Sequence, residues 1–313
     1  MPAVLYTPAK INLCLEVLGK RDDGYHEIAT VMQTVTWFDR MTVEAVDGPD
    51  MLSVCGPACA GVPDDDSNLV LKAADLLREK TGVKKGAKIL LEKSIPHGSG
   101  LGGGSSNAAA ALAILNRLWE TGLPHSELVE IASGIGSDVP FFLSGGLALA
   151  EGRGEKITKL PQVSSSLYFV LITPPLHVST AAVYNKLKTY LTFSNQYSKL
   201  KRLSGVEARG RSQTPAADIA EVFGVNDLQG AAFQIYPQLA ATWKVFEKLP
   251  FIARGMSGSG SCLYGVCTSR KEAIVGADAA SDAGIGRVTV VQEYRGPFLA
   301  FGASGLCMYH GKE

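Results

Sequence analysis

A glycine-rich stretch between an apolar run and an alanine-rich run constrains this chain more than any other feature. It covers residues 94–107 and reads SIPHGSGLGGGSSN. Glycine lets a backbone turn sharply and approach a ligand, because no Cβ is in the way, and successive N–H groups there can point at one anion. We therefore predict an ordered phosphate-binding loop, rather than a flexible turn, between a strand over 87–93 and a helix over 108–119. Ser105 and Ser106 would cap that helix or donate to phosphate.

Two better-known phosphate loops do not fit this stretch. The Walker pattern ends in Gly-Lys-Ser/Thr, and no lysine follows these glycines. The dinucleotide pattern G-x-G-x-x-G is formally present at Gly98, Gly100 and Gly103, but it requires a second strand that ends in an acidic residue. A turn over 121–124 and another helix over 126–133 follow instead. This order weakens the interpretation as a dinucleotide-dependent oxidoreductase.

Composition narrows the class of protein. The 313 residues favour two domains, and 46% apolar with 19% charged residues is ordinary for a globular protein. The net charge is zero, so neither a nucleic acid nor a membrane is an expected partner. No apolar run approaches the ~20 residues that span a bilayer, no signal-peptide pattern is present, and the six cysteines form no zinc motif. We expect a cytoplasmic protein with free thiols, as a monomer or weak homodimer.

The first strand-like region, residues 3–18, contains polar residues among apolar neighbours. On spacing alone, Lys10 and Asn12 fit a functional site and a solvent-facing strand equally well. A charged turn follows and ends in Tyr25 and His26. An aromatic ring beside an imidazole can stack on a planar ligand and hydrogen-bond it, although packing at the start of the next strand is the simpler explanation of the tyrosine.

The rest of the N-terminal half predicts a strand over 28–46, a loop over 47–67 and a helix over 68–80. Three aspartates over 64–66 suit the positive end of that helix better than they suggest a metal. Further on, Asp138 lies between small residues and a very apolar run, where a carboxylate is costly unless it has a partner. A helix cap just before a proline and a catalytic acid or base explain Asp138 equally well.

The second half of the chain begins with a proline- and serine-rich stretch over 160–166, which is typical of a domain boundary. The elements expected after it are a strand over 167–173, a helix after 178 that includes Tyr184, a polar segment over 189–216, helices over 227–236 and 237–249, a second glycine-rich turn over 255–261 and a strand over 288–292. The polar segment carries a basic excess, and a solvated loop explains it better than a nucleic-acid site.

Four features in this order resemble the GHMP kinase superfamily of small-molecule ATP kinases. They are PAKIN at 8–12, the glycine-serine loop from Pro96, GSDVP at 136–140 and the second glycine-rich turn. The resemblance implies an α+β, two-domain GHMP kinase fold with the active site in the cleft. An N-terminal ribosomal-protein-S5-like domain would cover 1–160, and a C-terminal α/β sandwich domain would cover 161–313. The polar insertion over 189–216 looks longer than the family needs.

The resemblance also implies roles for the motif residues. Those that would wrap the phosphates of ATP are Pro96, His97, Gly98, Ser99, Gly100, Leu101, Gly102, Gly103, Gly104, Ser105 and Ser106. Asn68 and Lys93 would lie near the adenine. Asp138 would accept the proton of the substrate's hydroxyl, and Lys10 beside it would stabilise the developing alkoxide. Mg²⁺ would accompany ATP, and no dedicated metal ligand is evident.

The run KRDDGYHE over 20–27 narrows the resemblance to the branch that phosphorylates the 2-hydroxyl of a cytidine diphosphate methylerythritol in the non-mevalonate isoprenoid pathway. Tyr25 and His26 would recognise the cytosine, Tyr184 would be a second stacking partner, and Asn12 would contact polar groups of the substrate. Two alternatives remain. A homoserine- or mevalonate-type kinase is disfavoured by the DGYH run, and a non-catalytic metabolite sensor on the same fold has no use for a lysine–aspartate pair.

Overall fold

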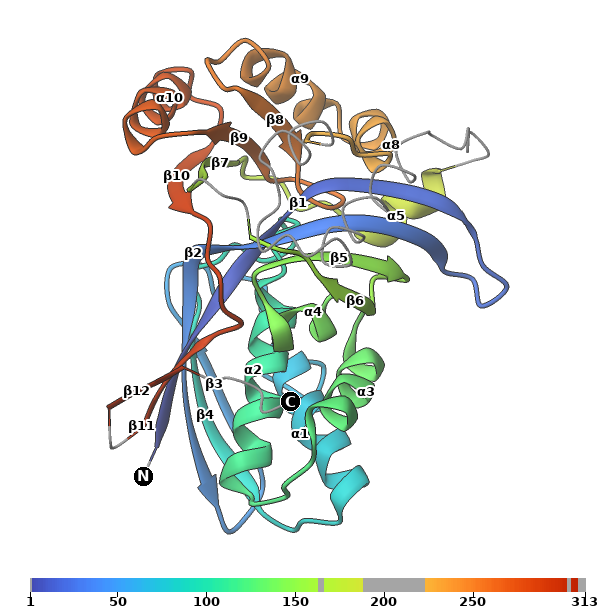
Figure 1. Ribbon diagram of the computed structural model, residues 1–313, viewed down its shortest axis with the longest axis vertical. Coiled ribbons are helices and arrows are strands. Elements are labelled where there is room, and N and C mark those ends of the chain that lie inside the picture. The colour runs from blue at the N-terminus through green and yellow to red at the C-terminus, as the bar shows by residue number, and fades with distance from the viewer. Residues whose placement is uncertain (1, 163–165, 188–222, 303–304, 309–313) are drawn as a thin grey trace.

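Figure 1 shows the computed structural model of the chain, which describes residues 2–162, 166–187, 223–302 and 305–308. Two β-sheets with helices against them confirm the expected α+β class. The larger sheet contains β1 (Ala3–Lys20), β2 (His26–Val46), β3 (Met51–Cys55), β4 (Gly86–Glu92), β5 (Leu147–Gly152), β6 (Lys156–Lys159), β11 (Leu299–Gly302) and β12 (Gly305–Met308). The smaller sheet contains β7 (Tyr168–Thr173), β8 (Ala253–Met256), β9 (Leu263–Cys267) and β10 (Arg287–Gln292). The helices are α1 (Leu69–Thr81), α2 (Gly103–Leu118), α3 (His125–Ile135), α4 (Val139–Ser144), α5 (Thr180–Lys186), α8 (Leu228–Ile235), α9 (Pro237–Phe246) and α10 (Arg270–Asp282).

The two longest strands, β1 and β2, run through both halves of the molecule (Figure 1). They pair antiparallel along almost their whole length, from Ala3 opposite Val43 to Lys20 opposite His26. Their many β-branched and aromatic residues favour extended backbone. The turn between them closes at Gly24, whose φ of +86° costs glycine little. One hairpin therefore supplies strands to both halves.

The larger sheet has the strand order β12-β11-β1-β2-β4-β3, with β5 paired to β2 and β6 to β5. The helices α1 to α4 gather against this sheet (Figure 1). Helix α2 lies at the centre of their core and buries an alanine-rich run over 108–113. Helix α1 begins at the cap Asn68, whose side chain accepts from the Val70 amide, and it ends at Gly82 in the left-handed conformation.

The smaller sheet has the order β10-β7-β9-β8, and α10 packs on it. A second core lies between this sheet and β1, β2 and β5, where Ile11 and Leu13 meet Phe169 and Tyr264. The Tyr264 hydroxyl donates to the Leu13 carbonyl at 2.7 Å. This buried contact fastens the smaller sheet directly to β1. Within the described ranges, no helix combines the length and apolar character needed to cross a bilayer.

Several elements differ from the sequence predictions. Helix α2 begins at Gly103, five residues before the predicted start at 108. Strand β3 pairs parallel with β4 inside the segment 47–67 that was predicted as a loop. Strand β11 pairs with β1 and β12 pairs with β11, so these two strands complete the larger sheet although the sequence division placed them in the second domain. The boundary near residue 160 stays a prediction, and the insertion 189–216 lies entirely outside the described residues.

Candidate active site

A cavity of about 760 Å³ opens between the two halves of the molecule. It is lined by the glycine-rich loop, β1, the β1–β2 turn, α5 and the second glycine-rich turn. These segments lie far apart in the sequence, and the β1–β2 hairpin and the two glycine-rich turns bring them together. Most of the predicted site residues therefore meet around one cavity.

The glycine-rich loop has a backbone that only glycine adopts without strain. Gly98, Gly100 and Gly102 have φ values of +65°, +80° and +70°. A Cβ built on Gly100 would lie 2.1 Å from the Ser257 carbonyl oxygen, so the two glycine-rich turns approach each other too closely for any side chain there. The Leu101 carbonyl accepts from the Lys10 amide at 2.9 Å. The loop is thus an ordered part of the site.

The start of α2 corrects the expected role of two serines. The N-cap is Gly102, so Ser105 and Ser106 lie in the first turn of the helix and are not its caps. Ser105 lines the cavity. The Ser106 hydroxyl is buried and has no hydrogen-bond partner among the described residues. The amides of this first turn, including those of Gly103 and Gly104, are the free donors that bind anions at helix ends.

The cavity contains an ion pair between Lys10 and Asp138. The Lys10 Nζ lies 3.2 Å from the Asp138 carboxylate; the lysine side chain is 4% exposed and the aspartate side chain 34%. Asp138 occupies the N-cap position of α4 but makes no capping hydrogen bond. The interpretation of Asp138 as a helix cap is therefore wrong. The pair combines a buried, fixed positive charge with a carboxylate that faces the cavity.

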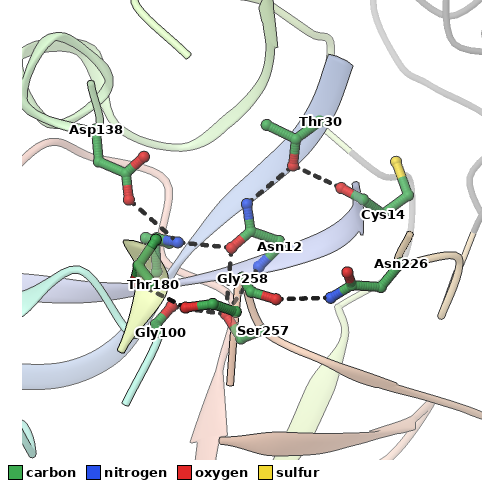
Figure 2. A network of polar contacts seen from close by, with 11 residues as sticks. Asn12, Cys14, Thr30, Gly100, Asp138, Thr180, Asn226, Ser257 and Gly258 are labelled. Atoms are coloured by element: carbon green, nitrogen blue, oxygen red, sulfur yellow. Dashed lines mark hydrogen bonds and ion pairs between the residues drawn. The ribbon is translucent and has the colours of Figure 1, made fainter. Parts of the chain in front are cut away.

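Asn12 lies at the centre of the polar network around this pair (Figure 2), and it accepts a hydrogen bond from the lysine of the pair. Its Oδ1 accepts from the Lys10 Nζ at 2.6 Å, and its Nδ2 donates to the Thr30 hydroxyl at 2.9 Å. The Asn12 amide donates to the Ser257 hydroxyl at 3.1 Å. Register shifts in β1 before Ala9 and after Asn12 bracket this segment and re-aim its side chains. The predicted contact of Asn12 with substrate stays a prediction, because its side-chain amide already has partners within the protein.

Three predicted aromatic residues line another part of the same cavity. The rings of His26 and Tyr184 are 5.1 Å apart, and Tyr25 beside them is 54% exposed. Burial and, to a smaller extent, Lys20 lower the pKa of His26, so its imidazole is neutral at pH 7. Burial also raises the pKa of the Tyr184 hydroxyl. Neutral, partly exposed rings are suited to stacking on a planar base.

The two residues expected near the adenine have partners in the fold. Asn68 lines the cavity but also caps α1. Lys93 lines the cavity, yet its Nζ forms a buried ion pair with Asp39 and donates to the Asn107 Oδ1 at 2.9 Å. Burial lowers the pKa of Lys93 against the opposing effect of Asp39. Their contact with adenine stays a prediction.

Sequence reasoning missed residues that hold the two loops in place. The Asp39 carboxylate accepts from the Ser94 and Ile95 amides at 2.7 and 2.9 Å, just before the phosphate loop. The Asn226 side chain donates to the Met256 and Gly258 carbonyls, both at 2.8 Å. Neither residue stands in a recognisable motif. Asp39 lies inside β2 and Asn226 just before α8, so no local sequence signal marks either residue as a support of these loops.

The geometry of the cavity defines a class of protein, a small-molecule kinase built on two lobes. Residues 68–146 match the protein family described as "GHMP kinases N terminal domain", and residues 206–286 match the family described as "GHMP kinases C terminal". A protein of Pelotomaculum thermopropionicum named 4-diphosphocytidyl-2-C-methyl-D-erythritol kinase is 42% identical over 266 residues, which cover 85% of this chain and 89% of that protein. This chain belongs to the same family within the GHMP kinases, and the resemblance drawn from its motifs is confirmed.

Solved structures agree with this assignment. A crystal structure of 4-(cytidine 5'-diphospho)-2C-methyl-D-erythritol kinase matches with a TM-score of 0.72 at 34% identity, covering 94% of this chain and 100% of that one. A homoserine kinase from Cytophaga hutchinsonii matches with a TM-score of 0.74 at 20% identity, covering 96% and 97%. The second likeness shows the fold alone. Because both scores are so similar, the overall fold does not distinguish between these two kinds of kinase.

Proposed function

We propose that this kinase transfers the γ-phosphoryl group of ATP to the 2-hydroxyl of 4-diphosphocytidyl-2-C-methyl-D-erythritol, a step of non-mevalonate isoprenoid biosynthesis. The names of its relatives support the substrate. The observation that carries the proposal is the position of the Lys10–Asp138 pair, which shares one cavity with an anion-binding loop and a group of aromatic rings. The same proposal carries the expectation of a cytoplasmic enzyme that acts as a monomer or weak homodimer.

The pair has the chemistry that such a transfer needs. An alcohol is a poor nucleophile, and a carboxylate within hydrogen-bond reach accepts its proton as the bond to phosphorus forms. Asp138 is exposed to the cavity and can take this role, while Lys10 places a fixed positive charge beside the developing alkoxide. Phosphoryl transfer otherwise depends mainly on positioning and on neutralising charge. The amides of the glycine-rich loop and of the first turn of α2 supply donors for the phosphates.

The proposal includes Mg²⁺ bound together with ATP, where it neutralises charge on the phosphate oxygens. The site fits a cation held in this way. The Ser106 hydroxyl is buried at the start of α2 without a partner among the described residues, so it would be a protein oxygen available to such a cation. In the described ranges no cluster of three His, Cys, Asp or Glu side chains is present. The remaining ligands would therefore be ATP oxygens and water.

The test is an ADP-release assay with three alcohols: 4-diphosphocytidyl-2-C-methyl-D-erythritol, homoserine and mevalonate. We expect rapid ADP release with the cytidine compound and none above background with the other two. Turnover of homoserine or mevalonate would overturn the substrate assignment. Binding of ATP and the cytidine compound without any ADP release would instead identify a sensor.

A further inference from the structure

Arg153 lies in the turn between β5 and β6 and lines the cavity close to Asp138. Three lysine and arginine side chains of the described part of the chain line this cavity. Lys10 pairs with Asp138, and Lys93 pairs with Asp39. Arg153 forms no ion pair with any described residue. It is therefore the cation of this cavity with which no carboxylate of the described chain forms a direct ion pair.

The contacts of Arg153 leave most of its donors available. Its guanidinium lies over the Tyr25 ring, 4.9 Å from the ring centre, and one Nη atom donates to the Ser133 carbonyl at a long 3.4 Å. Partial desolvation works to raise the pKa of Asp23, but the Tyr25 amide, Arg21 and Arg153 together hold it below its usual value. Asp23 itself pairs with Arg21. Arginine has five N–H donors, so the guanidinium retains capacity for an anionic ligand.

The position of Arg153 falls between the two ends of the proposed substrate site. A Cβ built on the next residue, Gly154, would lie 3.5 Å from the Ser137 side chain, so this turn packs directly beside Asp138. On its other side Arg153 contacts Tyr25. A cytidine diphosphate ester carries its two phosphates between the base and the alcohol. The guanidinium likewise lies between the Tyr25 ring and the segment that contains Asp138.

We infer that Arg153 binds the diphosphate of the substrate and so selects nucleoside diphosphate esters over uncharged alcohols. This inference rests on the proposed function and adds to it the group that recognises the central, charged part of the substrate. A guanidinium matches phosphate oxygens in a bidentate way and remains charged at every physiological pH. Its stack on Tyr25 links recognition of the phosphates to recognition of the base.

The experiment compares two ligands that differ only in their phosphates, cytidine diphosphate and cytidine. Calorimetry gives the affinity of each for the full-length wild-type enzyme, for Arg153→Gln and for Arg153→Lys. We expect Arg153→Gln to weaken the binding of cytidine diphosphate by about 10- to 100-fold, which is the effect of losing a hydrogen bond to a charged group. The affinity for cytidine should stay nearly unchanged. Arg153→Lys should restore part of the loss, because it keeps the charge without the bidentate geometry.

The matched control is Arg287→Gln. Arg287 also lies over an aromatic ring, 4.9 Å from the centre of Trp37, but it does not line the cavity. The control should leave the ratio of the two affinities unchanged. If Arg153 only supports Tyr25, Arg153→Gln weakens the binding of both ligands equally. The ratio of the two affinities then stays constant, which overturns the inference. Thermal melting of each variant identifies any that fail to fold, and Arg153→Lys then supplies the comparison.

Steady-state kinetics separate this inference from the proposed function. Arg153→Gln should raise KM for the cytidine substrate and leave KM for ATP unchanged. If the wild type turns over that substrate and Arg153→Gln has the wild-type affinity ratio, the diphosphate contact is wrong and the proposed function stands. If the wild type shows no turnover but the ratio depends on Arg153, the diphosphate contact stands and the proposed reaction is wrong.

Discussion

Asp138 shows how a residue at a helix start can face an ion-pair partner and the cavity instead of capping the helix. The residue stands at the N-cap position of α4, yet it faces Lys10 and makes no capping hydrogen bond. The lysine is held from behind by Asn12. A carboxylate that caps a helix accepts hydrogen bonds from the helix amides. The Asp138 carboxylate accepts none of these and lines the cavity, so it can accept a proton from a ligand there. Its sequence context could not distinguish the two roles, because the partner lies 128 positions away.

Substitution of Asp138 tests this role. Asp138→Asn keeps the size of the side chain but cannot accept a proton as a carboxylate does, so we expect kcat to fall by roughly 10²–10⁴. Calorimetric affinity for ATP and for the cytidine substrate should stay near wild type. If the transition state is loose and needs little base catalysis, the loss will be smaller, and Lys10→Met becomes the more damaging change. Full activity in both variants would contradict the hypothesis that Lys10 and Asp138 form a catalytic pair.

A second carboxylate, Glu16, gives the protein a pH-dependent stability. Burial, and then the charge of Asp227, raise the pKa of Glu16 from 4.5 to about 7. The folded state therefore binds more protons than the unfolded state between these two values, so this contribution to stability is lost as pH rises through that window. Glu16→Gln cannot ionise. We expect it to be more stable than wild type at pH 8 by about 1–3 kcal/mol, and to lose that advantage near pH 5.

Urea unfolding of both proteins at the two pH values measures this difference. The comparison at pH 5 is the internal control, because the wild-type carboxyl is then largely protonated in the folded state. A Glu16→Gln protein that is less stable than wild type at pH 8 would contradict the assignment.

Among the elements, the glycine-rich loop and α2 were predicted with the right order but the wrong boundary. Glycine is a poor helix former, so the sequence suggested that α2 starts only after Asn107. In the fold, a Cβ at Gly103 would lie 3.1 Å from the Ile95 side chain. Gly103 therefore allows the start of α2 to pack closely against Ile95. No local sequence pattern reveals this contact. A Cβ at Gly102 would similarly contact Phe142 and the aliphatic part of Lys10. Gly102 is therefore required by packing within the protein as well as by the approach of a ligand.

Gly100→Ala tests the contact between the two glycine-rich turns. The new Cβ would lie 2.1 Å from the Ser257 carbonyl, at a residue with φ of +80°. The loop must shift, and we expect KM for ATP to rise about 10- to 100-fold, as for other small displacements of binding groups. Steady-state kinetics at saturating cytidine substrate measure this change.

Gly122→Ala is the matched control for that variant. Gly122 also has a positive φ, +66°, but a Cβ there meets nothing within 4 Å. It should lose about 1–2 kcal/mol of stability from backbone strain alone and keep the wild-type KM for ATP. An equal rise of KM in both variants would show that strain, and not the contact with Ser257, controls ATP binding.

At the scale of the whole molecule, the motifs predicted the family, the α+β class and the order of most elements. They could not predict how β11 and β12 close the larger sheet, because strand pairing between residues nearly 300 positions apart leaves no local pattern. Nor could they predict α10, which the sequence reading left without an assignment. Most of the residues predicted from the motifs lie around one cavity, and their roles stay predictions. Its supports, such as Asp39 and Asn226, depend on three-dimensional contacts alone.

Removing residues 299–313 should expose the edge of β1. Tyr6, Leu5 and Val4 of β1 are opposite residues 299–301. An unpaired edge strand lowers stability and promotes association, so we expect a loss of about 1–3 kcal/mol and aggregation on heating, with KM for ATP unchanged. Calorimetric melting and light scattering measure both effects. Truncation after Met308, which keeps β11 and β12, is the control; equal loss in both proteins would assign the effect to the tail.

The long β1 strand has a consequence for any movement between the two halves. Its first residues pair within the larger sheet, while Leu13 and Leu15 exchange backbone hydrogen bonds with residues 224, 225 and 227 of the other half. A hinge between the two halves would therefore have to bend β1 itself or break these bonds. The same strand carries Lys10 and Asn12, so any such bending would also move the cation that faces Asp138.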